Sequence, residues 1–320
     1  MNLEREKGPI FHSGTIRAVA ILTFTFLFVA LIPFVGPVIV ILMPLPVLYF
    51  YSRLGRLQGL TILFVSCLAA YGILGGQRAN MPVLFMIGIT GVLLSEILKL
   101  RVSIEKTFLL ASSALFCCGA GFVLYYSFQA GIAPWQMVEL HVSDVVREKV
   151  KLYAPLMNLP EEQSLLIQES ATSFFTVTFP ALALSAAVFM VWVNLLVGRI
   201  LFRMQGAAFP DFGDLAAWKC PEGLVWILIA AGGMMLIPVE WVAIVGMNLL
   251  IVCSQIYLFQ GLAIAAYFFR QKRVPTIVRW LFYGLLIIQQ YLLVLVIAFG
   301  LFDMWVDFRK RIGGIGNVPA

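Results

Sequence analysis

The chain has 320 residues, of which 62% are hydrophobic and 12% are charged, and its net charge is +6. A water-soluble domain has about 45–50% apolar and about 25% charged residues, so this composition excludes a soluble protein. It predicts an all-α, polytopic bundle of transmembrane helices. The 22 lysines and arginines stand in short clusters between apolar runs, which is typical of topology determinants and not of a nucleic-acid-binding face.

A basic N-terminal tail, residues 1–17, precedes a first membrane bundle that we expect over residues 18–130. Because a spanning helix needs about 20 apolar residues, the 34 uncharged residues from Ala18 to Tyr51 are too many for one span. Prolines and glycines interrupt them, which predicts a tight hairpin of two short spans, with a re-entrant loop as the alternative. Three further spans are predicted at about 58–76, 81–98 and 107–130.

An extramembrane region is predicted over residues 131–170, on the outer side. Valines at helical spacing from Val138 to Val150 face a row of charged residues, which indicates an amphipathic helix. The stretch from Asn158 to Glu162 is typical of a second helix start, since a proline and two acids stand in its first turn. The region is therefore expected to form a helical hairpin, either as an interfacial lid or as a site for a membrane protein partner.

A second membrane bundle is predicted over residues 171–302, with spans at about 172–198, 223–238, 241–269 and 277–302. This makes nine spans in all, or eight if the last run does not cross. Residues 303–320 then form a charged interfacial helix and tail. The inner loop around residues 203–223 holds prolines, glycines and aromatic residues, so we expect an ordered loop against the bilayer.

The positive-inside rule sets the orientation. With the N-terminus inside and nine spans, the inner segments hold 15 lysines and arginines and the outer segments hold 7. Arg309, Lys310 and Arg311 are the main exception, because the ninth span places them outside. They can return inside only if the run 277–302 fails to cross, yet this run has the composition of an ordinary span.

Amide side chains are the first group that could carry a function, since polar side chains at membrane depth are costly. Asn248 and Gln255 are seven residues apart and so share a helix face, which Gln260 continues. Neighbouring spans contribute three more amides. Interhelical hydrogen bonds explain the amides, whereas convergence on one cavity would make a site for a small solute. The residues of that candidate site are Asn194, Asn248, Gln255, Gln289 and Gln290.

Glu96 is the acid well inside an apolar run, with Lys99 three residues later. A carboxylate paired with this lysine near the inner end of its span is one reading. A buried proton or cation site is the other.

The C-terminal stretch carries Asp303, Asp307 and Arg311 at spacings of four residues, which predicts a charge ladder on one helix face. Trp305 suits the headgroup layer, so the stretch is an interfacial anchor or, alternatively, a gate or docking element. On this reading Asp307→Ala should disturb the C-terminus more than Arg309→Ala does.

Catalytic motifs are not found: the sequence has no phosphate-binding GxxxxGK[ST], no HExxH and no GxSxG. Five cysteines without CxxC spacing and two histidines predict no metal site. We therefore expect neither an enzyme nor a bound cofactor.

Three stretches together carry a family resemblance: "MPLPVLYFYSRLGRLQG", "WKCPEGLVWILI" and "GLFDMWVDFRKR". In their order and spacing they resemble the YybS-like family of bacterial membrane proteins, which is similar in outline to the S subunits of energy-coupling-factor vitamin transporters. The resemblance implies a multi-pass protein of the bacterial inner membrane that captures a small solute. The chain departs from S subunits, which usually have six spans and an AxxxA contact face.

Two hypotheses follow. The protein is a solute-binding or transport-related module whose pocket the amides line, or it is a scaffold or regulator that acts through the outer hairpin and the C-terminal helix. Convergence of the amides on a cavity favours the first, and pairing in packed interfaces favours the second.

Overall fold

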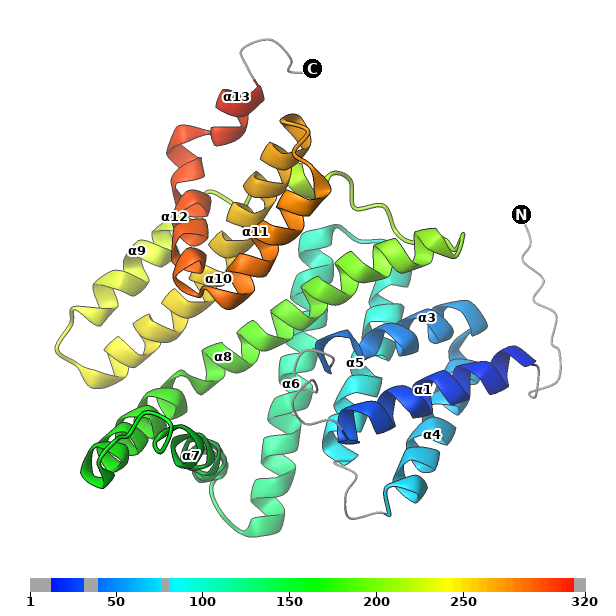
Figure 1. Ribbon diagram of the computed structural model, residues 1–320, viewed down its shortest axis with the longest axis horizontal. Coiled ribbons are helices and arrows are strands. Elements are labelled where there is room, and N and C mark those ends of the chain that lie inside the picture. Colours follow the sequence, from blue (N-terminus) through cyan, green and yellow to red (C-terminus); the bar gives the residue numbers. More distant parts are fainter. Residues whose placement is uncertain (1–12, 32–39, 76–80, 314–320) are drawn as a thin grey trace. The chain divides into compact units, whose positions relative to one another are not determined.

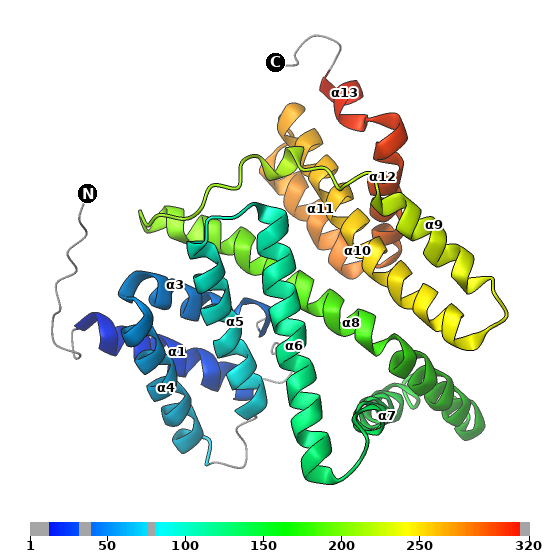
Figure 2. The ribbon, with the colours of Figure 1, turned by 180° about the vertical axis from the view of Figure 1, so that it is seen from behind.

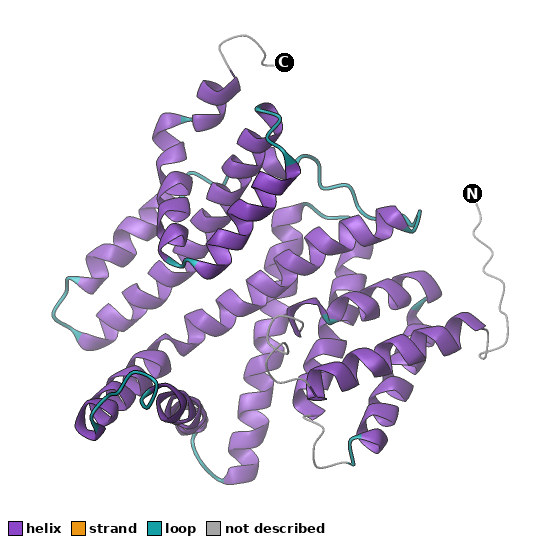
Figure 3. Cartoon of the chain, in the orientation of Figure 1, coloured by secondary structure: helices purple, strands orange, loops and turns teal. Residues whose placement is uncertain are grey.

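A computed structural model of the chain describes residues 13–31, 40–75 and 81–313. Helices and connecting loops make up these ranges, with no β-strand among them (Figure 3). The predicted all-α fold is confirmed. The chain divides into two compact units, and helix α8 (Glu161–Met204) contributes to both.

The first unit comprises residues 1–137 and 186–211. Its core is formed by the apolar faces of α1 and the helices that follow it, and includes Leu22, Phe26, Val47 and Ile62. Gly91 in α5 lies close to Val47 in α3: an added Cβ at Gly91 would stand 2.5 Å from the Val47 Cβ. The two helices can therefore pack this closely only because residue 91 has no side chain. Besides the second part of α8, the described helices of this unit include α1 (Ser13–Leu31), α3 (Pro44–Leu54), α4 (Arg56–Ile73), α5 (Met81–Lys99) and α6 (Ile104–Ala130).

The second unit comprises residues 138–185 and 212–320. In Figure 1, α9 and α10 lie side by side, and α12 crosses α10. The crossing is close because it is made by glycines: an added Cβ at Gly261 would lie 2.1 Å from the carbonyl oxygen of Val296. The remaining elements are α7 (Pro134–Tyr153), the short 3-10 helix η1 (Leu215–Ala217), α9 (Leu224–Met235), α10 (Glu240–Gln271), α11 (Thr276–Ile288), α12 (Tyr291–Val306) and α13 (Phe308–Gly313).

Helices stand at both positions expected for the outer hairpin, namely α7 and the start of α8. Val138, Val142 and Val146 are the buried residues of α7, in keeping with its amphipathic pattern. α8 continues without interruption from Glu161 to Met204. The domain boundary drawn between residues 170 and 171 therefore falls inside one helix.

Described helices lie at all nine predicted spans, with two of them in the last span, but the lengths of these helices differ. Among the described residues, four helices are long and apolar enough to cross a membrane: α4, α6, α8 and α10. The apolar stretches Gly14–Phe28, Val40–Leu54 and Leu224–Met235 are shorter. α5 occupies the position predicted at 81–98, while the turn expected near residues 33–37 and the N-terminal residues 1–12 lie outside the described residues.

The last predicted span differs most from expectation. α11 ends at Ile288 and α12 begins at Tyr291, and the two helices are bent by 111° at this break. The prediction that residues 277–302 form an ordinary span is wrong. Apolar composition predicted the length of the run correctly, but it does not report a turn of the backbone inside that run.

Candidate functional site

Asn248 links α10 to the backbone of α8. Its Oδ1 accepts from the backbone N–H of Ala181 at 3.0 Å, and its Nδ2 donates to the carbonyl of Val177 at 2.9 Å. In an uninterrupted α-helix this N–H and this carbonyl bond to each other. Pro180 stands between them and disturbs the helical hydrogen bonds. The amide of Asn248 thus satisfies both backbone groups beside the proline.

Gln255, two turns further along α10, makes a similar link. Its Nε2 donates to the carbonyl of Ser185 in α8 at 2.8 Å. Asn194 lies in the first unit, fully buried, and its Nδ2 donates to the carbonyls of Ile41 and Met190, each at 2.7 Å. All three amides therefore bond to backbone carbonyls in packed helix interfaces.

Gln289 and Gln290 have a different environment, because they form the break between α11 and α12. The N–H of Gln289 donates to the carbonyl of Leu285 at 2.7 Å and closes α11, and both glutamines are exposed. Their apolar neighbours Ile287 and Ile288 are exposed as well, at 81% and 79%.

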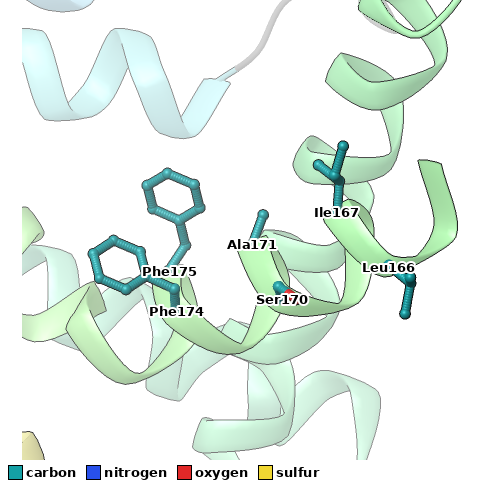
Figure 4. Close-up of a pocket in the computed structure, with 6 residues that line it drawn as sticks. All are labelled: Leu166, Ile167, Ser170, Ala171, Phe174 and Phe175. Carbon is teal, nitrogen blue, oxygen red and sulfur yellow. The ribbon is translucent and has the colours of Figure 1, made fainter. Parts of the chain in front are cut away.

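The five predicted solute-binding residues thus fall into two groups: Asn194, Asn248 and Gln255 bond to backbone groups, and Gln289 and Gln290 stand at a helix break. A hollow among the described residues, shown in Figure 4, lies on α8 and contains none of the five. The hollow is lined by Leu166, Ile167, Ser170, Ala171, Phe174 and Phe175.

A buried ionic cluster lies at the end of α12. Asp303 is 2% exposed, and its Oδ2 accepts from Arg309 Nη1 at 2.7 Å and from Gln260 Nε2 at 3.1 Å. Its Oδ1 accepts from the backbone N–H of Phe308 at 2.9 Å. Every oxygen of this carboxylate therefore has a donor, which a buried charge requires.

Arg309 extends the cluster to the loop before α9. Its Nε donates to the carbonyl of Ala216 at 3.2 Å and its Nη2 to the carbonyl of Trp218 at 2.8 Å. The N–H of Cys220 in the same loop donates to Gln260 Oε1 at 3.2 Å. We call Gln260, Asp303 and Arg309, with these loop groups, the C-terminal cluster. It joins α10, α12, α13 and the loop 214–220.

Asp307 breaks the predicted charge ladder. Its φ of 45° is left-handed, so α12 ends there and α13 starts in a new direction. The prediction that Asp303, Asp307 and Arg311 share one helix face is wrong for this reason. Asp307 instead lies 3.2 Å from Lys219 Nζ and 3.1 Å from Lys310 Nζ, while Arg311 is exposed.

The pKa of Asp307 reflects two opposing causes. Burial raises it, but hydrogen bonds from Lys310 and Lys219 outweigh this, so the pKa of Asp307 lies below its usual value. Burial lowers the pKa of Arg309 and the charge of Asp303 opposes that shift. The C-terminal stretch is thus a set of ion pairs that hold a fixed conformation.

Glu96 in the first unit is paired. Its carboxylate accepts from Arg56 Nε at 3.0 and 3.1 Å and from Lys99 Nζ at 2.6 Å. This geometry agrees with the reading of a paired carboxylate. Within the described ranges no three acidic, histidine or cysteine side chains gather as a metal site would require.

The sequence pattern does not predict the partners of Arg309. Arg309 stands six residues after Asp303, a spacing that separates two side chains on a continuous helix. Only the left-handed residue between them brings the two charges together. Gln260 continues the helix face of Asn248 and Gln255, but its neighbours in the sequence do not indicate an acidic partner 43 residues away.

Comparison with known proteins identifies the family of this chain. No curated protein and no solved structure matches this chain. The family DUF2232, described as predicted membrane proteins, matches residues 20–304, which is most of the chain. Together with the apolar helices described above, this match shows that the chain belongs to the DUF2232 family of membrane proteins.

Proposed function

We propose that the protein is a small-solute-binding or transport-related module, with several membrane passes, in a bacterial inner membrane. This is the role that the YybS-like outline and its similarity to S subunits imply. The break at Gln289 and Gln290 is the observation that supports it.

Backbone that leaves a helix inside the bilayer is costly, because water is not present to bond its N–H and C=O groups. Such breaks are tolerated where protein buries them or where they line a water-filled cavity. Transporters use interrupted helices to bind solutes near the middle of the membrane. Two exposed glutamines at such a break suit a solute that forms hydrogen bonds.

The charge of the solute is indicated by the residues around the break. From Tyr283 to Phe302, the part of α11 and α12 around the break contains no Asp, Glu, Lys or Arg. A charged solute would therefore lack a counter-ion there. A neutral solute with amide, hydroxyl or heterocyclic groups is favoured.

A second candidate function is a scaffold or regulator that acts through the outer hairpin. It is supported by the turn between α7 and α8, where Leu156 and Met157 are 73% and 67% exposed. Exposed apolar residues at a turn suit contact with another membrane protein or with lipid.

Thermal unfolding of the purified protein against neutral amino acids, nucleosides and water-soluble vitamins tests the first proposal. A solute that binds the folded state should raise the unfolding temperature, and the stabilisation grows with the logarithm of its concentration relative to its dissociation constant. We expect the double variant Gln289→Leu/Gln290→Leu to lose this shift.

Gln255→Leu is the matched control, because it removes an amide that only links two helices. It should lower the basal unfolding temperature and keep the solute-induced shift. A shift of equal size in the double variant, or no shift with any of these solutes, would contradict the proposal.

A further inference from the structure

The two helices after α10 are individually too short to cross a bilayer. At about 1.5 Å per residue, the 13 residues of α11 extend about 20 Å and the 16 residues of α12 about 24 Å. The hydrocarbon core is about 30 Å thick. Neither helix alone therefore reaches from one membrane surface to the other.

The direction of the chain reverses between them. The bend of 111° exceeds a right angle, so α12 turns back toward the side from which α11 came. Figures 1 and 2 both show α11 running away from the end of α10 and α12 returning toward α13. The pair has the course of a hairpin.

Ion pairs and hydrogen bonds place both ends of this hairpin beside the same loop. Asp214, at the start of the loop 214–220, accepts from Arg270 Nη2 at the end of α10, at 2.6 Å. Arg309 donates to Trp218 and Lys219 pairs with Asp307, at 2.8 and 3.2 Å. Contacts of this length cannot be made across a bilayer, so the end of α10, this loop and the C-terminal cluster lie on one side.

We infer that α11 and α12 form a re-entrant hairpin, and that the C-terminal cluster holds its second helix against the cytoplasmic loop 214–220. The C-terminus then lies inside, and not outside as nine full spans would place it. This inference goes beyond the proposed function and does not depend on a solute.

The charge distribution supports this placement independently of the contacts. Moving Arg309, Lys310 and Arg311 from the outer seven bases to the inner fifteen gives eighteen inside and four outside. The exception to the positive-inside rule disappears. Because the rule concerns insertion and not contacts between side chains, the two observations are separate.

Thiol labelling tests the side of the C-terminus. In a background with the five native cysteines replaced, Arg311→Cys and Lys272→Cys each give one exposed thiol, and Glu148→Cys gives one on α7. Intact cells and inverted membrane vesicles are treated with a membrane-impermeant maleimide. We expect Arg311→Cys and Lys272→Cys to react in inverted vesicles and not in intact cells, and Glu148→Cys to show the opposite pattern.

Reaction of Arg311→Cys on the side opposite to Lys272→Cys would overturn the inference. The result does not depend on solute binding, since the hairpin can be present in a protein that binds no solute. Failure of the thermal-shift experiment and failure of this one are therefore distinguishable.

Cys220 gives a test of the C-terminal cluster itself. It is 6% exposed in the loop that Arg309 holds, and burial, with a smaller contribution from Cys253, raises its pKa to about 11. In a chain that keeps Cys220 as its single cysteine, we expect slow labelling in inverted vesicles. Arg309→Ala should increase the labelling rate about tenfold or more, because loss of local stability raises the population of the open loop.

Lys310→Ala is the matched control, since Lys310 is exposed and next in sequence to Arg309. It should leave the rate of Cys220 labelling nearly unchanged. If Arg309→Ala does not accumulate, Arg309→Lys keeps the charge and removes the guanidinium fork that reaches two carbonyls, and it should also speed labelling. Equal rates in the wild type and in the folded Arg309 variant would overturn the role of the cluster.

Discussion

Each unit of the protein contains a carboxylate held by basic side chains, and the two differ in their exposure to solvent. In the first unit Glu96 pairs with Arg56, whose side chain is 73% exposed. In the second unit Asp303 pairs with Arg309, whose side chain is 7% exposed. A solvated ion pair contributes little to stability, whereas a buried pair is costly to break because one charge is left alone.

The two groups of charges also differ in the segments that they connect. The exposed pair joins the first residue of α4 to the last turn of α5. The buried cluster joins α12 and α13 to α10 and to the loop 214–220, which are 43 and about 90 residues away in sequence. Conformational specificity of the C-terminal region is therefore expected to depend on Asp303 and Arg309 far more than on Glu96 and Arg56.

The largest effect is expected for Asp303→Ala. Removing this carboxylate leaves the Arg309 guanidinium buried without its counter-ion, which should cost about 3–5 kcal/mol of unfolding free energy. Unfolding of the purified protein in detergent by chemical denaturant measures the change. Asp307→Ala is the control and should cost less, because the Asp307 side chain is 23% exposed. A larger loss for Asp307→Ala than for Asp303→Ala would contradict the difference between the buried and the exposed pairs. It would favour the charge ladder, in which Asp307 is the residue that matters most for the C-terminus.

A second prediction concerns the crossing of α10 and α12, on which the buried cluster depends. At Gly300 an added Cβ would lie 2.0 Å from the carbonyl oxygen of Tyr257, so Gly300→Ala should cost about 1–3 kcal/mol. Gly284→Ala is the control, since no neighbouring atom lies within 4 Å of its Cβ position. Thermal unfolding should separate the two variants; equal midpoints would show that the crossing is not tightly packed.

The amide link between α8 and α10 should be intermediate in strength. Asn248→Leu removes the partner of the Ala181 N–H and of the Val177 carbonyl beside Pro180, with an expected loss of about 1–2 kcal/mol. Gln255→Leu, which removes one donor to a carbonyl, should cost less. Denaturant unfolding of both variants gives the two losses of unfolding free energy. A larger loss for Gln255→Leu than for Asn248→Leu would contradict the role of Asn248 beside Pro180.

Acid should weaken the partly exposed pairs of Asp307. Because its pKa in the folded protein lies below the value in the unfolded chain, the pairs stabilise the fold fully above the usual pKa of aspartate. This contribution is lost as the pH falls through the lowered pKa. The difference in unfolding temperature between the wild type and Asp307→Asn should therefore shrink toward zero as the pH falls, and a constant difference would contradict the assignment.

The smallest effect is expected for the exposed pair. Arg56→Ala should leave the unfolding free energy unchanged within the error of measurement, since the guanidinium is solvated and Glu96 retains Lys99 as a partner. A double-mutant cycle with Glu96→Gln measures the coupling directly. A coupling as large as that between Asp303 and Arg309 would remove the distinction between the two units.

Several features of this protein were determined by its sequence alone. The apolar composition determines that the chain enters a membrane as helices, since backbone polar groups in lipid must be bonded within the chain. The period of the valines predicted α7, and the proline and acids at residues 160–162 marked the start of α8. These are local features, because hydrophobicity, period and capping depend on residues that are close in sequence.

The tertiary structure decided which polar groups meet. Arg309 bonds to the carbonyl of Ala216, 93 residues away, and it does so only because Asp307 ends α12 in a left-handed conformation. The turn at Gln289 and Gln290 was also hidden, since an uninterrupted apolar run has the same composition whether it crosses the bilayer or folds back within it. The physical reason is common to both: hydrophobicity is a sum over neighbours in the chain, whereas a hydrogen bond between distant segments depends on where the folded backbone brings them.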